Sequence, residues 1–175
     1  MNKNFLLLGG LGVLALLLYS NSANASSNTS GNAPGNFDLS QLTNDPTDLQ
    51  YISNLYTELQ TRGLTNQQIL FMLAQCFFET GILTSNPSVG NYNLISQNNF
   101  AGLTNVGGGY ASYNSISDFV TAYIGFLTKG SNPLGASSLT DFNNRLQQNK
   151  YYTENPQIYY NGLLTYYNEL FNIGT

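Results

Sequence analysis

Few side chains in this 175-residue sequence could do nucleophilic or acid–base chemistry. Histidine is absent, which removes the usual base of serine and cysteine nucleophiles and the most common zinc ligand. The single cysteine, Cys76, lies in an apolar run with no cation near it in sequence, so we expect a packed core thiol rather than a reactive one. Carboxylates are the remaining candidates.

Glu79 differs from the other carboxylates in its local sequence. It follows Phe77 and Phe78 at the end of the most apolar helical segment, with Gln75 and Cys76 about one turn before it. A carboxyl group there would be partly desolvated, which raises its pKa and keeps it protonated near neutral pH. Such a group can protonate a glycosidic oxygen as a general acid. The alternative is a helix-end carboxylate that points into water.

The remaining carboxylates and the overall charge suggest no second kind of chemistry. Asp48, Glu58 and Asp141 fall in first turns or on polar helical faces, where carboxylates are ordinarily solvated or help to cap. Only 8% of the residues are charged and the net charge is -4, so no basic patch could neutralise a phosphate backbone. We therefore expect no nucleic-acid partner, and no metal or organic cofactor is indicated.

Helices must position Glu79, because most apolar residues recur at helical spacing. An N-cap followed by proline predicts a first helix over residues 46–61. A capping box at Thr65 and Gln68 predicts a second helix, which carries Glu79 to about Thr80. Further helices are predicted to start at Ser117, at Ser138 and at Asn155.

Between residues 81 and 113 the helical period disappears and Gly, Asn, Ser and Pro accumulate. The run Asn-Val-Gly-Gly-Gly at 105–109 separates two short segments, which predicts loops and one small hairpin. The expected fold is α+β and mostly α, with a β-hairpin inserted after the helix that carries Glu79.

The N-terminal segment is typical of export. Lys3 precedes an apolar stretch from Phe5 to Leu18, and a small-x-small pattern follows it, so residues 1–25 are predicted to be a signal peptide or a membrane anchor. Residues 26–45 are rich in Ser, Asn and Gly and are predicted to be a flexible linker. The folded domain is then 46–175, exported across the cytoplasmic membrane or anchored in it, and facing the cell wall from the periplasm or the cell surface.

Four segments together resemble one enzyme family. Residues 79–85 (Glu-Thr-Gly-Ile-Leu-Thr-Ser) resemble the Glu-Ser-Gly-Trp-Gly-x-Ser segment of glycoside hydrolase family 73, the glucosaminidases of bacterial autolysins, within the lysozyme-like superfamily. Residues 99–104 are similar to its Asn-Leu-Phe-Gly-Ile-Lys strand, and 110–119 to its hairpin-to-helix passage. Residues 152–159 resemble its Tyr-Ala-Thr-Asp-Pro-x-Tyr block, with one extra residue.

The resemblance implies a lysozyme-like helical domain that cleaves the glycan strands of peptidoglycan. It implies that Glu79 is the catalytic acid and that Tyr152 lines the cleft next to it. It also implies that Asn99 and Gly102 shape the neighbouring strand, and that Tyr113 belongs to the substrate-binding hairpin passage. Tyrosine suits such a site because it offers an apolar face to a sugar ring and a hydroxyl to its edge.

The sequence departs from the family in two places. The tryptophan and glycine of the first motif are Ile82 and Leu83 here. No acidic residue lies between Glu79 and Asp118, so the usual pair of carboxylates lacks an obvious second member. Asp118 is the candidate for that role, although its place after Ser115 and Ser117 favours a first-turn charge.

Several alternatives stay open at this point. Two mechanisms need one carboxyl group: attack by the substrate's acetamido group, or attack by the muramoyl 6-hydroxyl as in lytic transglycosylases. The bond cut is that of a glucosaminidase, a muramidase or a transglycosylase. The other functional class is a non-catalytic peptidoglycan-binding or structural protein of the wall or the virion. The setting is a bacterial cell or a bacteriophage particle.

Overall fold

The computed structural model describes residues 37–83 and 90–173, and these are mostly helical. The elements in chain order are the 3-10 helix η1 (Leu39–Gln41), α1 (Pro46–Gln60), α2 (Asn66–Thr80), α3 (Asn93–Ser96), α4 (Ile116–Leu127), the 3-10 helix η2 (Pro133–Gly135), α5 (Leu139–Gln148) and α6 (Pro156–Asn172).

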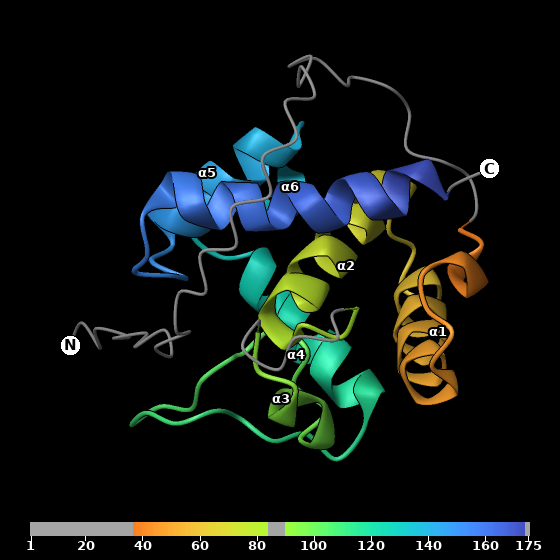
Figure 1. Cartoon of the computed structure of the whole chain (residues 1–175). Coiled ribbons are helices and arrows are strands. Elements are labelled where there is room, and N and C mark those ends of the chain that lie inside the picture. Colours follow the sequence, from red (N-terminus) through yellow and green to blue (C-terminus); the bar gives the residue numbers. More distant parts are fainter. Residues whose placement is uncertain (1–36, 84–89, 174–175) are drawn as a thin grey trace.

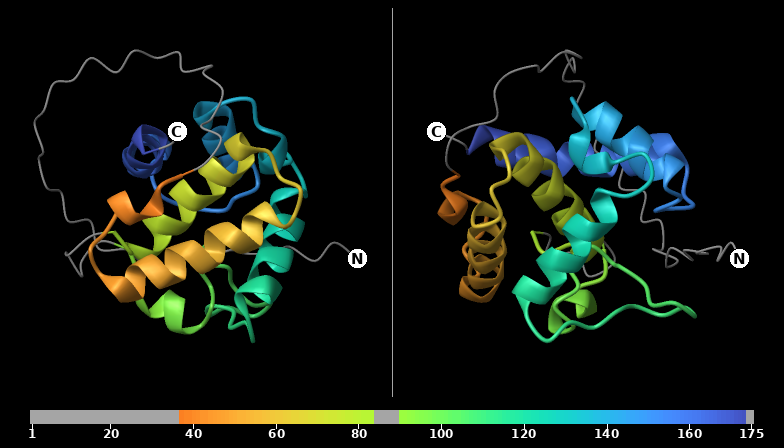
Figure 2. Two further views of the ribbon diagram at one scale, coloured as in Figure 1. Left: turned by 90° about the vertical axis from the view of Figure 1, so that its right-hand side faces the viewer. Right: turned by 180° about the vertical axis from the view of Figure 1, so that it is seen from behind.

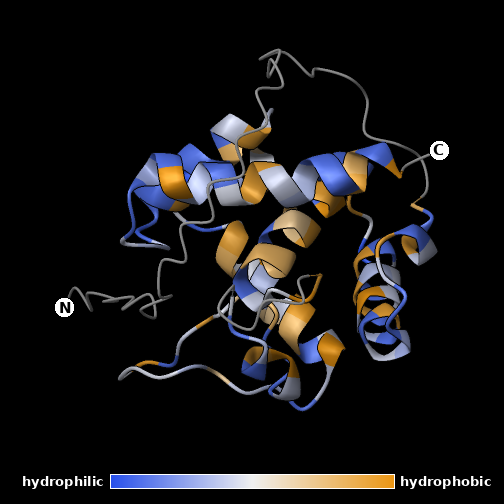
Figure 3. Cartoon of the chain, viewed as in Figure 1, coloured by the Kyte–Doolittle hydropathy of each residue, from blue (hydrophilic) through white to orange (hydrophobic). Residues whose placement is uncertain are grey.

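The helix α2 runs through the middle of the domain. The helix α6 packs across it, α1 lies along one side, and α4 lies on another (Figures 1 and 2). Most residues of α2 are buried, including apolar ones on every side, which is typical of a central helix. Figure 3 shows its apolar character against the more polar outer faces of α1 and α6. Cys76 is buried here as a free thiol, as predicted.

The predicted start signals of the first two helices are confirmed. The side chain of Asp45 accepts hydrogen bonds from the backbone N–H groups of the first turn of α1, with Pro46 as its first residue. Thr65 and Gln68 form the reciprocal capping box of α2, through bonds of 3.3 and 2.9 Å. Gly81 ends α2 in the left-handed conformation.

The later helices also start near their predicted caps. Ser138 caps α5 and Asn155 caps α6. The cap of α4 differs by two residues from the prediction, because Ser115 rather than Ser117 accepts the hydrogen bond of the first turn. The hydroxyl of Ser117 instead accepts a hydrogen bond of 2.8 Å from Arg62, at the end of α1.

The segment between α2 and α4 was predicted to contain loops and a hairpin. It contains the short helix α3, and beyond it an antiparallel bridge joins Thr104 to Tyr110 across the glycine-rich turn. Residues 37–83 and 90–173 include no β-strand. The segment around residues 105–109 therefore forms a loop whose two arms are joined by one antiparallel bridge, and not a hairpin of two strands.

The predicted linker extends too far along the chain. Phe37 and Leu39 are buried, and the ring of Phe37 packs edge-on against Tyr56 of α1 with centroids 5.4 Å apart. Residues 37–45 therefore belong to the folded domain. The rest of the linker and the N-terminal segment 1–25 lie outside the described residues. Within residues 37–83 and 90–173, no helix is long and apolar enough to cross a membrane.

Candidate active site

Glu79 lies in the last turn of α2, where its side chain is partly exposed. The chain contacts this helix end again at Asn91, whose backbone N–H donates a 2.8 Å hydrogen bond to the carbonyl oxygen of Glu79. Gly90 permits the return, since a Cβ atom there would stand 2.3 Å from the backbone nitrogen of Gly81. The end of α2 that carries the carboxyl group is thus held in place by the segment at Gly90 and Asn91.

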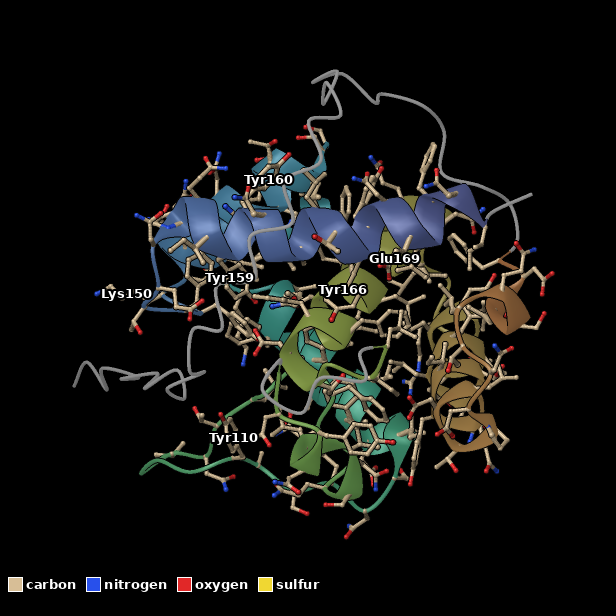
Figure 4. The ribbon with its side chains drawn as sticks, in the orientation of Figure 1. Tyr110, Lys150, Tyr159, Tyr160, Tyr166 and Glu169 are labelled. Atoms are coloured by element: carbon tan, nitrogen blue, oxygen red, sulfur yellow. The ribbon has the colours of Figure 1, made fainter. Side chains whose placement is uncertain are left out.

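A phenol holds one carboxyl oxygen. The hydroxyl of Tyr159, in the first turn of α6, donates a 2.6 Å hydrogen bond to Oε1 of Glu79. The ring of Tyr159 is buried, and Phe78 packs edge-on against it at 5.1 Å. Gly162 makes room for the ring of Phe78, which a Cβ atom at this position would meet at 2.2 Å. Figure 4 shows Tyr159 on the side of α6 that faces α2.

Tyr152 was predicted to line the cleft beside the acid, and the structure corrects this prediction. Its ring stacks on the ring of Tyr159, with centroids 3.8 Å apart and planes at 9°. Its hydroxyl donates a 3.0 Å hydrogen bond to Oδ1 of Asn143, and only 8% of the residue is exposed. Tyr152 therefore supports the ring that contacts Glu79 and does not contact Glu79 itself.

The second carboxyl oxygen, Oε2, faces Gly102. A Cβ atom at position 102 would lie 3.4 Å from Oε2 and 3.7 Å from the ring of Tyr110. The φ angle of Gly102 is +61°, in the left-handed region that favours glycine. Tyr110 is partly exposed and lies on the same side of the molecule as Tyr159 (Figure 4). Gly102 therefore lies beside Oε2 of Glu79, its predicted part in substrate binding stays a prediction, and Tyr110 is a neighbour that the sequence did not single out.

The environment raises the pKa of Glu79 from its ordinary value of 4.5 to about 7. Desolvation by burial is the largest cause, because it disfavours the charged form. The phenol of Tyr159 acts the other way by stabilising the carboxylate, and the negative charge of Glu154 raises the pKa further. Tyr151 has a smaller lowering effect. Near neutral pH, Glu79 therefore exists in both protonation states.

Asn99 was predicted to bind substrate, but its side chain is fully buried. The amide nitrogen donates to the carbonyl oxygens of Leu103 and Ala111 at 2.8 and 2.9 Å, and Oδ1 accepts from the N–H of Leu103 at 2.9 Å. All the polar atoms of the side chain are engaged with backbone. Asn99 therefore shapes the loop that carries Gly102 and Tyr110, as the resemblance implied for the strand, and does not reach substrate.

Tyr113 and Asp118 are not brought to Glu79 by any described contact. The ring of Tyr113 packs edge-on against Phe119 at 5.7 Å, at the junction of the loop and α4. Asp118 is exposed in the first turn of α4, where its N–H donates to the hydroxyl of Ser115. The first-turn interpretation of Asp118 fits this position.

A shallow hollow of about 230 Å³ lies near the other end of α6, lined by Gln41, Leu42, Leu83, Glu169 and Ile173. Burial raises the pKa of Glu169, but its carboxyl group accepts no hydrogen bond within the described residues. Glu169 lies well along α6 from Tyr159 (Figure 4). Glu79 is the better candidate because hydrogen bonding fixes the position of its carboxyl group.

The described residues contain no cluster of three or more His, Cys, Asp or Glu side chains that could hold a metal ion. Comparisons of the chain with protein-family models, with curated proteins and with solved structures found no match. The resemblance to glycoside hydrolase family 73 therefore stays a prediction, and function is inferred from the site itself.

Proposed function

We propose that this chain cleaves the glycan strands of peptidoglycan, with Glu79 as the general acid in a domain of the lysozyme-like kind. In this proposal the loop closed by Thr104 and Tyr110 takes the place of the small hairpin. The observation that carries the proposal is a partly exposed carboxyl group with a pKa of about 7, oriented by the phenol of Tyr159. Such a group can give up a proton near neutral pH.

The hydrogen bond from Tyr159 determines which carboxyl oxygen acts. Because Oε1 accepts the proton of the phenol, the proton of the neutral carboxyl group belongs on Oε2. Oε2 faces Gly102, where the missing side chain leaves room for the glycosidic oxygen. The ring of Tyr110, beside Gly102, offers an apolar face to the adjoining sugar.

The reaction then needs one carboxyl group. Oε2 gives its proton to the glycosidic oxygen as the bond to the anomeric carbon breaks, and the bonding electron pair leaves with that oxygen. The substrate's acetamido oxygen then bonds to the anomeric carbon, and water later replaces it and returns a proton to Glu79. In the transglycosylase alternative, the muramoyl 6-hydroxyl attacks instead and its proton returns to Glu79.

The setting is part of the proposal. Residues 1–25 would carry the domain across the cytoplasmic membrane or hold it there, so that it meets the cell wall, with a bacteriophage particle as the other setting. The partner is then the peptidoglycan glycan strand, and the membrane is contacted only through the N-terminal segment.

The test is digestion of purified peptidoglycan by the whole chain, followed by turbidity and by mass spectrometry of the soluble fragments. We expect the wild type to release fragments and Glu79→Gln to release none while keeping its circular dichroism spectrum. Glu58→Gln is the matched control, because Glu58 lies on α1 in an ion pair with Arg62. We expect it to keep full activity.

The products distinguish the alternatives. A loss of water at the muramoyl end identifies transglycosylation, and a new reducing end identifies hydrolysis and the bond that is cut. Equal release by Glu79→Gln would reject Glu79 as the acid. Binding to peptidoglycan without any soluble fragment would favour the non-catalytic wall or virion protein.

A further inference from the structure

A chain of buried polar side chains leads from Glu79 into the core. Gln75 lies one turn before Glu79 on α2 and is fully buried. Its amide nitrogen donates a 3.2 Å hydrogen bond to the phenolic oxygen of Tyr159. Its amide oxygen accepts a hydrogen bond from the hydroxyl of Tyr123, which is fully buried on α4. Three helices thus contribute to one connected chain.

The donors in this chain all point toward Glu79. An amide oxygen only accepts, so the proton of Tyr123 is engaged with Gln75. With its oxygen held there, Gln75 turns its NH₂ group to Tyr159. The oxygen of Tyr159 accepts this hydrogen bond, and its own proton goes to Glu79. If the amide of Gln75 were flipped, its oxygen would compete with Glu79 for the proton of Tyr159.

An amide in an apolar core is costly to bury unless it is hydrogen-bonded. Leu70, Leu73 and Phe71 fill equivalent buried positions of α2 with apolar side chains, as a central helix requires. Gln75 is therefore an exception that packing alone does not require.

Six titratable groups belong to this hydrogen-bond chain or surround it. They are Glu79 and Cys76 on α2, Tyr123 on α4, Tyr151 and Glu154 between α5 and α6, and Tyr159 on α6.

We propose that Gln75 and Tyr123 are positioning residues. They keep the hydroxyl of Tyr159 donating its hydrogen bond to Oε1 of Glu79, so that the carboxyl group carries its own proton on Oε2, which faces Gly102. This inference rests on the proposed function for its meaning in catalysis. The hydrogen-bond chain itself can be tested whether or not the protein turns over substrate.

The test is Tyr123→Phe in the whole chain, with two readouts. Without the hydroxyl, the amide of Gln75 is free to flip and to accept the proton of Tyr159, so Glu79 loses its donor. The pKa of Glu79 then rises, and we expect a shift of about one pH unit in a ¹³C NMR titration of the carboxyl groups. The signal of Glu79 is the one that Glu79→Gln lacks. The pH at which kcat/KM falls on the basic side of its pH profile should rise by the same amount, while kcat falls about tenfold.

The control and the double variant make the test specific. Tyr56→Phe removes another buried phenol hydroxyl, on α1 against Phe37, and should shift neither readout. Tyr123→Phe combined with Tyr159→Phe should shift the pKa no more than Tyr159→Phe alone, because Tyr123 acts through Tyr159. Gln75→Leu leaves no amide oxygen to compete for the proton of Tyr159, so it should not reproduce the shift, and it should abolish the shift when it is added to Tyr123→Phe. A pKa shift in Gln75→Leu as large as that of Tyr159→Phe would contradict the inference even if Tyr123→Phe does not fold.

An unchanged titration in Tyr123→Phe, or additive shifts in the double variant, would overturn the inference while leaving Glu79 as the acid. The expected NMR shifts in the variants, together with a wild type that cleaves no peptidoglycan, would overturn the proposed function and leave the hydrogen-bond chain established.

Discussion

Replacing Glu79 by glutamine should stabilise the protein at neutral pH, even though it should abolish the catalysis that we propose. The folded state raises the pKa of this carboxyl group, mainly by desolvation, so ionisation costs more in the folded protein than in the unfolded chain. Glutamine is uncharged, has nearly the same shape, and still offers an oxygen to the hydroxyl of Tyr159. The variant removes the cost of ionisation and keeps the contact.

The magnitude follows from the two pKa values. A raised folded-state pKa contributes stability that is fully present below 4.5 and is lost as the pH rises through about 7. At about 1.4 kcal/mol per pH unit, the unfolding free energy of the wild type should be lower than that of Glu79→Gln by about 1 kcal/mol near pH 5. The difference should be about 2 kcal/mol near pH 6 and about 3 kcal/mol above pH 7. These are upper values, because solvent that reaches the partly exposed carboxyl group screens part of the cost.

The assay is urea unfolding of both proteins across this pH range, with the difference in unfolding free energy plotted against pH. Other titrating groups cancel in the difference. Glu58→Gln is the matched control of opposite sign, since the hydrogen bond from Arg62 lowers the pKa of Glu58. It should be less stable than wild type at neutral pH, and the difference should vanish in acid.

A flat difference between wild type and Glu79→Gln over pH 5 to 8 would refute the reasoning, because it would mean that the carboxyl group is solvated in the folded protein. A difference that grows toward acid would refute it more strongly, since it would mean that the folded state favours the carboxylate.

Four further predictions concern the surroundings of the acid. Asn99→Ala should lower the unfolding free energy by about 3 kcal/mol in urea, because it leaves the buried N–H of Leu103 and the buried carbonyl oxygen of Ala111 without this partner. Gly102→Ala should cost about 1 kcal/mol of stability for its positive φ, and its methyl group beside Oε2 should reduce kcat/KM about tenfold to hundredfold. Asp118→Asn should leave kcat/KM unchanged; a hundredfold loss would make Asp118 a second carboxylate. Glu154→Gln should move the basic limb of kcat/KM to lower pH, because the negative charge that raises the pKa of Glu79 is removed; an unmoved limb would contradict this.

The sequence predicted the helices well because their ends carry local signals. A side-chain oxygen that accepts from the next turn, a proline in first position and a left-handed glycine act within a few residues, so no knowledge of the fold is needed to find them. Glu79 was identified for a similar reason, since Phe77 and Phe78 are its immediate neighbours. The linker boundary was missed because Phe37 is a lone apolar residue whose partner, Tyr56, comes from another element.

The tyrosine beside the acid could not be identified from its motif alone. Tyr152 lies in an irregular connection, where no periodicity fixes the direction of a side chain. Tyr159 lies in α6, in phase with the buried residues Leu163, Tyr166 and Leu170. This phase was the available signal, because it places the phenol on the face of α6 that packs against α2. What it could not give is the pairing of that phenol with Glu79, which depends on how the two helices cross.

The raised pKa of Glu79 depends on the scarcity of cations in this chain. The sequence has five Lys and Arg residues, and Arg62 and Arg145 form ion pairs with Glu58 and Asp141, whose pKa values are lowered as a result. A guanidinium group at Glu79 would lower its pKa in the same way and leave it ionised at neutral pH. A neutral phenol orients the carboxyl group while desolvation still dominates its pKa. The hydrogen bond from Tyr159 gives the carboxyl group of Glu79 a fixed direction, and desolvation keeps a proton on it near pH 7, and these are the two requirements of the general acid that we propose.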